Sequence, residues 1–156
     1  MEENMIDNIH WLGHASFKIT HDKTIYIDPY EIEGGETADI ILITHNHYDH
    51  CSLEDIEKIK GPQTVIITTS DTASQISGNV KTIKPGDTIT EAGISIEAVP
   101  AYNVRKSFHP KENNWVGYII TIGDKRVYHT GDSDAIPEMS AVKADIVLIP
   151  VGGTYT

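Results

Sequence analysis

Cysteine is almost absent from this sequence, since Cys51 is the only one among 156 residues. A single cysteine rules out a disulfide within the chain and is typical of proteins that stay in a reducing compartment such as the cytoplasm. It also argues against a structural zinc site, because such sites usually rely on several thiolates. We therefore expect a cytoplasmic protein whose metal ligands, if it has any, are of other kinds.

Positive charge is also scarce. The 12 lysines and arginines are outnumbered by 23 aspartates and glutamates, which gives a net charge of −11. Such a balance disfavours binding to the phosphate backbone of nucleic acids and to anionic membranes. The sequence therefore predicts a small-molecule substrate, with no nucleic acid and no membrane as partners, and it leaves a homo-oligomer open.

Long hydrophobic runs are missing as well. No stretch approaches the ~18 consecutive apolar residues of a membrane-spanning helix. The first eleven residues, MEENMIDNIHW, are acidic and contain no apolar core of a signal peptide. With 39% hydrophobic and 22% charged residues, the 156 residues are enough for one soluble domain over residues 1–156.

Short, β-branched apolar segments bounded by turn residues fill most of the chain, and this pattern predicts strands. Ser52 and Asp55 resemble a capping box that opens a helix over residues 53–59, and weaker helical signals cover residues 71–76 and 137–142. A strand meander followed by strand–helix alternation predicts an α/β sandwich with helices outside. The predicted strands cover residues 9–12, 16–20, 24–28, 39–44, 64–69, 80–83, 95–100, 116–122, 126–129 and 145–150.

Four side chains that can bind metal lie within six positions, directly after the apolar run 40–43: His45, His47, Asp49 and His50. In an extended segment, His45 and His47 point to one face, as two ligands of one metal require. Asp49 and His50 follow in a turn, offset toward a second position, as in two-metal hydrolytic sites. Imidazole and carboxylate are ligands that Zn²⁺ selects, so the cluster predicts an open, working metal site rather than a polar loop.

This run, HNHYDH at residues 45–50, resembles the H-x-H-x-D-H signature of the metallo-β-lactamase superfamily of metal-dependent hydrolases. The GHAS and IDP segments at residues 13–16 and 27–29 resemble the branch with ascorbate-6-phosphate lactonase-like and N-acyl-phosphatidylethanolamine phospholipase D-like proteins. The GDSD segment at residues 131–134 is similar to a later superfamily motif. The resemblance implies an α/β fold, the four-layer αββα metallo-β-lactamase sandwich.

The resemblance also implies a ligand set. His45 and His47 would bind a first metal, Asp49 and His50 a second, and Asp132 would bridge the two. A bridging carboxylate makes physical sense, because it offsets the repulsion between two dications. If the upstream cluster were absent, Asp132 would be interpreted as an ordinary turn residue after Gly131.

The third ligand of the first metal has two candidates. Many relatives place a histidine after a Pro-Ala-aromatic stretch, and here that position is Asn103, whose amide is an unusual zinc ligand. His109 belongs to the same loop and is the candidate we favour. Arg105 and Lys111 could add positive charge for an anionic substrate, or they could simply be solvated.

Two further residues have weaker signals. His14 is either a support for a ligand or substrate, or a histidine that bonds between two strands. Asp28, before Pro29, could position the ligand loop through hydrogen bonds, although Asp-Pro is also a common turn start.

The C-terminus departs from the expected pattern. Full-length relatives continue past the segment that corresponds to residues 150–156, and there they add a helix and a strand that delivers a last histidine to the second metal. We therefore expect the last layer of the fold to be incomplete and the second metal to be weakly held.

The function expected from these residues is metal-dependent hydrolysis. The metal lowers the pKa of a water toward neutrality, Asp49 orients that water or accepts its proton, and an ester, lactone or phosphodiester is cleaved. The expected cofactor is Zn²⁺, one or two ions, with Mn²⁺ or Fe as alternatives. The rival interpretation is a degenerate or truncated domain that binds metal without turnover.

Overall fold

The structure is a computed structural model that describes residues 4–104 and 108–149. It divides into two compact units, residues 1–82 and residues 83–156, each built around one β-sheet. The single domain expected over residues 1–156 stays a prediction. In the part of the chain that is described, no helix is both long enough and apolar enough to cross a membrane.

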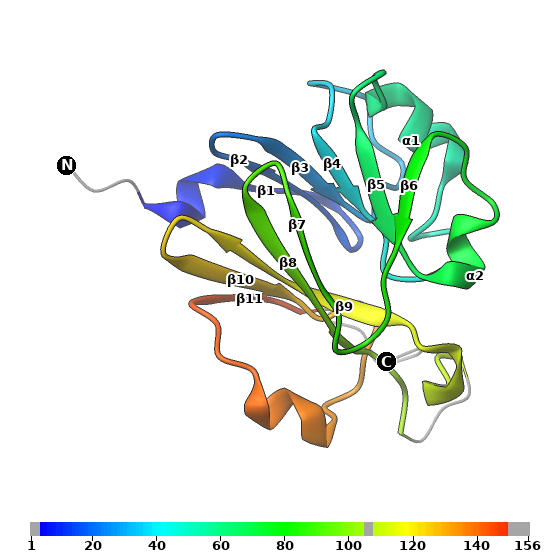
Figure 1. Ribbon diagram of the computed structural model, residues 1–156, viewed down its shortest axis with the longest axis vertical. Helices are drawn as coiled ribbons and strands as arrows, with labels where there is room; N and C mark the ends of the chain where they lie inside the picture. Colours follow the sequence, from blue (N-terminus) through cyan, green and yellow to red (C-terminus); the bar gives the residue numbers. More distant parts are fainter. Residues whose placement is uncertain (1–3, 105–107, 150–156) are drawn as a thin grey trace. The chain divides into compact units, whose positions relative to one another are not determined.

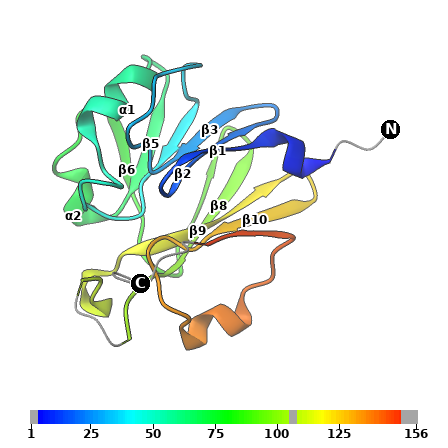
Figure 2. The ribbon, with the colours of Figure 1, turned by 180° about the vertical axis from the view of Figure 1, so that it is seen from behind.

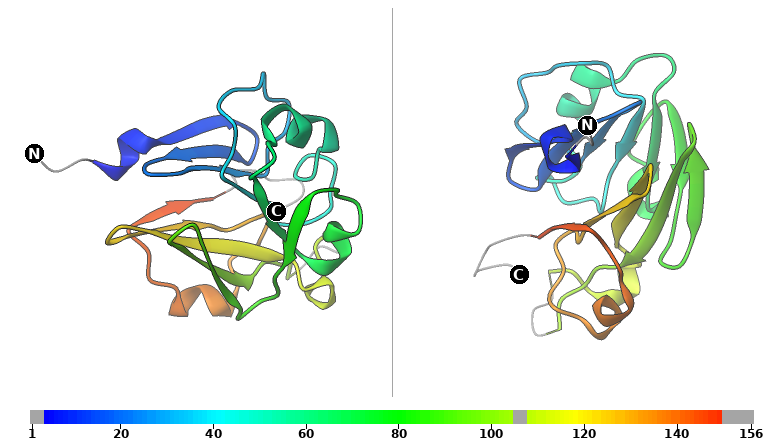
Figure 3. Two further views of the ribbon diagram at one scale, coloured as in Figure 1. Left: turned by 45° about the horizontal axis from the view of Figure 1, so that its top comes forward. Right: turned by 90° about the vertical axis from the view of Figure 1, so that its left-hand side faces the viewer.

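The first unit contains a six-stranded sheet in the order β1-β2-β3-β4-β5-β6 (Figure 1). The first three strands form an antiparallel meander and the last three join β3 in parallel, which brings the carboxyl ends of β3 and β4 together at one edge. Figure 3 shows the hairpin of β1 and β2 in blue and β6 in green. The strands are β1 (Ile9–Gly13), β2 (Ser16–Thr20), β3 (Thr24–Ile27), β4 (Ile40–Leu42), β5 (Val65–Thr68) and β6 (Asn79–Thr82).

The helices of this unit are α1 (Leu53–Ile59), α2 (Ser70–Ala73) and a short 3-10 turn, η1 (Met5–Asn8). The side chain of Ser52 accepts a hydrogen bond from the backbone of Asp55, so α1 begins as the capping pattern predicts. Helix α2 is shorter than the predicted helix over residues 71–76.

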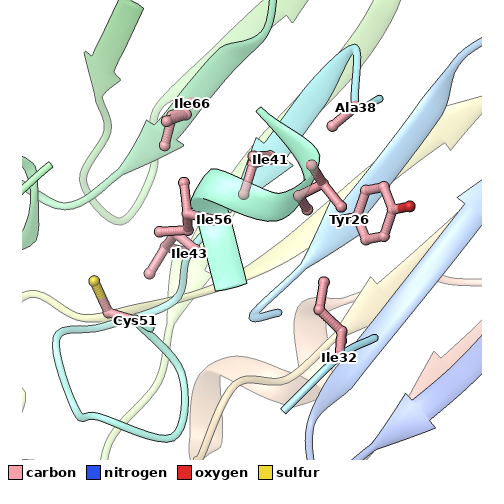
Figure 4. Packing of buried hydrophobic residues seen from close by; sticks show 9 residues of the cluster. Tyr26, Ile32, Ala38, Ile41, Ile43, Cys51, Ile56 and Ile66 are labelled. Carbon is pink, nitrogen blue, oxygen red and sulfur yellow. The ribbon is translucent and has the colours of Figure 1, made fainter. Parts of the chain in front are cut away.

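The core of the first unit lies between α1 and one face of the sheet (Figure 4). Ile56 and Ile59 of the helix pack with side chains of β3, β4 and β5, and Cys51 closes the cluster beside Ile43. Burial raises the pKa of the Cys51 thiol to about 11, so this residue packs as a small apolar side chain. The buried members of the cluster are Tyr26, Ile32, Ala38, Ile41, Ile43, Cys51, Ile56, Ile59 and Ile66.

The second unit contains a five-stranded sheet in the order β11-β10-β9-β8-β7. All neighbouring strands are antiparallel except β10 and β11, which are parallel. The 3-10 turn η3 (Pro137–Ala141, orange in Figure 2) covers one face, where Met139 packs against a cluster that contains Tyr128. The strands are β7 (Thr88–Glu91), β8 (Ile94–Pro100), β9 (Val116–Ile122), β10 (Lys125–His129) and β11 (Ile146–Leu148), and a second 3-10 turn is η2 (Lys111–Asn113).

Most of the expected elements are present. The mixed α/β class with two sheets is confirmed, and each of the ten predicted strands has a counterpart within the described residues, although residue 150 lies outside them. Strand β7 was not predicted, and the segment expected as a helix over residues 137–142 is a 3-10 turn.

Candidate metal centre

The metal-binding motif begins where β4 leaves the sheet. Ile43 still donates a backbone hydrogen bond to Ile67 in β5, but the amide of Thr44 turns to the Asp28 carboxylate, 2.8 Å away. A tight turn follows, because the carbonyl of His47 accepts hydrogen bonds from the amides of His50 and Cys51. Residues 45–50 are therefore wrapped into a compact loop between β4 and α1.

The three histidine rings of this loop lie against one another. The ring centroids of His45 and His47 are 4.7 Å apart, and those of His45 and His50 are 4.1 Å apart. His45 and His50 are buried, and His47 is partly buried. The three imidazoles of the motif thus lie together within the first unit.

Hydrogen bonds fix which nitrogen of each buried ring carries the proton. Asp28 Oδ2 lies 2.7 Å from His50 Nδ1, and a carboxylate only accepts, so Nδ1 donates and Nε2 holds the lone pair. Thr44 Oγ1 gives its single proton to Asp28, which makes it the acceptor for His45 Nδ1 at 2.8 Å. Both histidines therefore present Nε2, which is the form that ligates a metal.

Asp28 connects Thr44 and His50 through its hydrogen bonds. Its carboxylate is fully buried and receives the amide and hydroxyl of Thr44 as well as the ring of His50. Its backbone has a φ of 46°, a left-handed conformation that a non-glycine residue adopts only at a cost. The sequence suggested that Asp28 positions the ligand loop, but nothing in the pattern pointed to Thr44.

Asp49 is a partly exposed member of the predicted ligands on this loop. Its side chain is 33% exposed, and Oδ2 lies 3.8 Å from His50 Nε2. The carboxylate is therefore beside the ligating nitrogen of His50 and open to solvent. A group that hydrogen-bonds to a water molecule needs such access.

Further candidate residues of the second unit lie together on the loop after β8. Asn103 Oδ1 lies 2.8 Å from His109 Nδ1 and accepts a further hydrogen bond from the His109 amide at 3.1 Å. An amide oxygen only accepts, so the proton is on Nδ1 of His109 and the lone pair is on Nε2. Both residues are buried. Asn103 thus supports His109 with the oxygen that it would otherwise offer to a metal.

Asp132 and Asp134 complete this cluster from the loop after β10. Asp132 Oδ2 lies 3.4 Å from His109 Nε2, so the predicted bridging carboxylate and the favoured histidine lie together. Asp134 accepts hydrogen bonds from the Asn103 side chain at 3.2 Å and from the Val104 amide at 2.7 Å. Asp134 therefore fixes the orientation of Asn103, which in turn orients His109. The sequence pattern did not reveal this role of Asp134.

Other candidate residues have different surroundings. His14 is exposed and stacks on Tyr30, with ring centroids 5.0 Å apart. Lys111 lies over the Tyr102 ring and 3.5 Å from Glu138, so its charge is partly compensated. A hydrogen bond from the Tyr102 hydroxyl holds the pKa of the Glu138 carboxyl below its usual value. Arg105, Pro150 and the C-terminal segment 150–156 lie outside the described residues.

The comparisons with known proteins show the family to which this chain belongs. The family model for the beta-lactamase superfamily domain matches residues 8–156. A UPF0173 metal-dependent hydrolase of Thermoplasma volcanium is 35% identical, over 94% of this chain and 71% of its own length. A solved protein of Parabacteroides distasonis, assigned as a metal-dependent hydrolase, is 38% identical with a TM-score of 0.88, over 95% of this chain and 71% of the other.

A more distant structure from Thermotoga maritima is assigned as a Zn-dependent hydrolase of the metallo-β-lactamase superfamily. It is 27% identical with a TM-score of 0.62, over 95% of this chain and 63% of that one. The chain therefore belongs to the metallo-β-lactamase superfamily, and within it to the UPF0173 group of metal-dependent hydrolases.

Proposed function

We propose that this protein is a zinc-dependent hydrolase that directs an activated water at an ester, lactone or phosphodiester bond of a small molecule. The observation that carries the proposal is that three histidines carry their ring proton on the same nitrogen, Nδ1. His45, His50 and His109 each use Nδ1 in a hydrogen bond with the protein, which presents Nε2 as the ligating atom.

The proposed ligand set takes its pattern from the superfamily motif. His45, His47 and His109 would hold the first metal, Asp49 and His50 the second, and Asp132 would bridge them. Asn103 is excluded from the set, because its carbonyl oxygen already accepts two hydrogen bonds from His109. These residues fit zinc, since imidazole and carboxylate are its ordinary ligands in sites that keep an open position.

When bound, the metal supplies a water of lowered pKa and an electrophile that polarises the scissile oxygen. Asp49 orients the attacking water and takes its proton, for which its exposed carboxylate is suited. Asp28 holds His50 in the ligating tautomer throughout, and Asn103 does the same for His109.

Three considerations favour a particular metal, substrate class and cellular compartment. The relative from Thermotoga maritima is assigned as Zn-dependent, which favours zinc over Mn²⁺ or Fe. The branch that the GHAS and IDP segments resemble favours lactones and phosphodiesters over β-lactam substrates. The single buried cysteine favours the reducing cytoplasm as the compartment.

Metal add-back tests the proposal. The purified protein is stripped with a chelator, and Zn²⁺, Mn²⁺ or Fe²⁺ is restored before turnover is measured on δ-valerolactone and bis(p-nitrophenyl) phosphate. We expect turnover of one of the two substrates to vanish on stripping and to return with Zn²⁺. Metal binding with no turnover of lactones, esters or phosphodiesters would instead support the degenerate domain.

A further inference from the structure

A set of aromatic rings, two of them exposed and the middle one partly buried, lies beside the metal-binding motif within the first unit. The Tyr48 ring contacts Tyr30 edge-on, with centroids 5.9 Å apart, and Tyr30 stacks on His14 at 5.0 Å with an interplanar angle of 11°. We call His14, Tyr30 and Tyr48 the aromatic ladder. Because Tyr48 stands between His47 and Asp49 in the motif, the ladder begins at the proposed metal ligands.

The backbone holds the ladder in place. His14 has a φ of 49° in the turn between β1 and β2, and its carbonyl accepts a hydrogen bond from the indole of Trp11 at 2.9 Å. The amide of Tyr30 donates to the buried hydroxyl of Ser16 at 2.9 Å. Two of the three ladder residues are therefore anchored through main-chain atoms, which leaves their rings available for contact.

Packing within the protein does not account for Tyr48. Its side chain is 76% exposed, although a tyrosine ring in water forgoes the stabilisation that burial would bring. The ring of the preceding His47 packs against His45, whereas the Tyr48 ring lies outward against Tyr30. Anything that approaches the motif from this side meets an aromatic surface.

Carboxylates flank the ladder. Burial raises the pKa of the Tyr30 hydroxyl above its ordinary value, and the carboxylates of Glu31 and Asp49 raise it further. Glu31 is exposed and is not among the proposed metal ligands, so its negative charge stays beside the rings and repels an anionic group. Aromatic faces in such surroundings favour a flat ring that carries no negative charge.

We infer that the aromatic ladder is the specificity surface of the site, and that it binds an uncharged aromatic ring in the non-reacting part of the substrate. This inference rests on the proposed hydrolase function and names the class of substrate within it. Tyr48 makes the primary contact, while Tyr30 and His14 hold its ring at the required angle. Stacking of this kind contributes about 0.5–1.5 kcal/mol, which is a preference of roughly 2- to 12-fold.

The test compares two lactones with the same six-membered ring, 3-isochromanone, whose fused benzene bears neither the carbonyl carbon nor the leaving oxygen, and δ-valerolactone, which has no benzene. We expect Tyr48→Ala to lower the ratio of kcat/KM for 3-isochromanone over δ-valerolactone roughly 3- to 10-fold, chiefly through KM. Tyr48→Phe keeps the ring and should keep the ratio. Leu53→Ala removes an exposed apolar side chain outside the ladder and should also leave the ratio unchanged.

An unchanged ratio in Tyr48→Ala overturns the inference, and so does an equal fall in Leu53→Ala. A binding measurement separates this failure from failure of the hydrolase proposal. Saturation-transfer NMR on the intact protein compares acetanilide with N-cyclohexylacetamide, which differ in the aromatic ring alone. Preferential contact with acetanilide that Tyr48→Ala abolishes supports the ladder even without lactone turnover, whereas equal signals from both amides contradict it.

Discussion

Asn103 and His109 form a hydrogen-bonded pair in which the asparagine side chain orients the histidine ring. The asparagine oxygen accepts from both the amide and the ring of His109, and the asparagine nitrogen donates to Asp134. Every polar group of the Asn103 side chain thus has a role in orienting the loop. In this account, Asn103 supports His109 and is not itself a metal ligand.

Substitution of this asparagine tests that role. We expect Asn103→Ala to weaken zinc binding about 10- to 100-fold, the usual effect of removing a group that orients a metal-ligating histidine. His109→Ala should weaken zinc binding further, because it removes the ligand itself. A competition titration against a chromophoric chelator measures both, with the exposed Asn79→Ala as a control that changes nothing. A stronger loss in Asn103→Ala than in His109→Ala would reverse the assignment.

Two buried tyrosines differ in their hydroxyl groups. Tyr26 donates to the carbonyl of Glu36 at 2.9 Å, whereas the Tyr128 hydroxyl has no hydrogen-bond partner among the residues that the structure describes. Burial raises the pKa of Tyr128 to about 12. Because an unpaired buried hydroxyl costs free energy, Tyr128→Phe should raise the free energy of unfolding by about 1 kcal/mol, and Tyr26→Phe should lower it by about as much. Urea unfolding of both variants provides the measurement, and equal losses would contradict the distinction.

At the scale of elements, Asp55 joins helix α1 to the loop that follows β3. Its carboxylate accepts hydrogen bonds from the amides of Glu31 and Ile32, from Ser52 and from Lys58. Burial alone would raise the pKa of this carboxyl, but these hydrogen bonds outweigh burial and hold the pKa below its ordinary value. Glu31 has a φ of 52°, so the hydrogen bond that its amide donates to Asp55 helps to hold a strained part of the loop.

The pH dependence follows from the sign of this shift. A carboxyl whose pKa is lower in the folded state stabilises the fold above its unfolded pKa of about 4, and the stabilisation is lost as the pH falls further. Asp55→Asn should therefore cost about 2 kcal/mol at pH 7, and the difference from wild type should shrink below about pH 4. Urea unfolding of Asp55→Asn and of wild type at pH 7, 5 and 3.5 measures this difference in the free energy of unfolding. A difference that is constant over this range would exclude the charge as the cause.

Gly117 in β9 lies where two strands approach closely. A Cβ atom at this position would stand 2.5 Å from the carbonyl oxygen of His129 and 2.9 Å from the backbone of Thr130, neither of which is a flexible side-chain end. His129 ends β10, and Thr130 follows it on the way to Asp132. Only glycine therefore fits between β9 and the segment that presents this carboxylate.

Gly117→Ala should destabilise the protein by about 1–3 kcal/mol, as overpacking does, and should weaken metal binding as well. Gly61→Ala is a matched control, because there the new atom meets the side chain of Thr37, which can rotate. Thermal unfolding and metal titration of both variants measure the effects. If Gly61→Ala lost as much metal affinity as Gly117→Ala, the contact with the backbone of His129 and Thr130 would not be the reason.

The sequence predicts elements best where local signals are strong, and α1 (Leu53–Ile59) is found with the predicted bounds. Strand β4 ends at Leu42, two residues early, because Asp28 takes the Thr44 amide that would have extended the ladder. Strand β7 has one apolar residue, Ile89, and forms through its pairing with β8, which local pattern does not reveal. The candidate ligands could likewise be listed from sequence, but the hydrogen bonds that set their tautomers depend on residues distant in the chain.

At the scale of the whole molecule, the proposed ligand set draws on both units. His45, His47, Asp49 and His50 belong to residues 1–82, and His109 and Asp132 belong to residues 83–156. Each unit has its own sheet and its own buried cluster, so each can position its ligands by itself. In this account, metal binding links the stability of the two units, since a ligand that binds the folded state alone stabilises it.

The most direct test of the account measures metal content and turnover on the same samples. Wild type, His47→Ala and the exposed-turn control His21→Ala are analysed by mass spectrometry for metal per chain and assayed on the lactone and phosphodiester panel. We predict one or two zinc ions with turnover in wild type and in His21→Ala, and loss of both in His47→Ala. Full metal content and turnover retained in His47→Ala would contradict the central claim that the HNHYDH loop is the working metal centre.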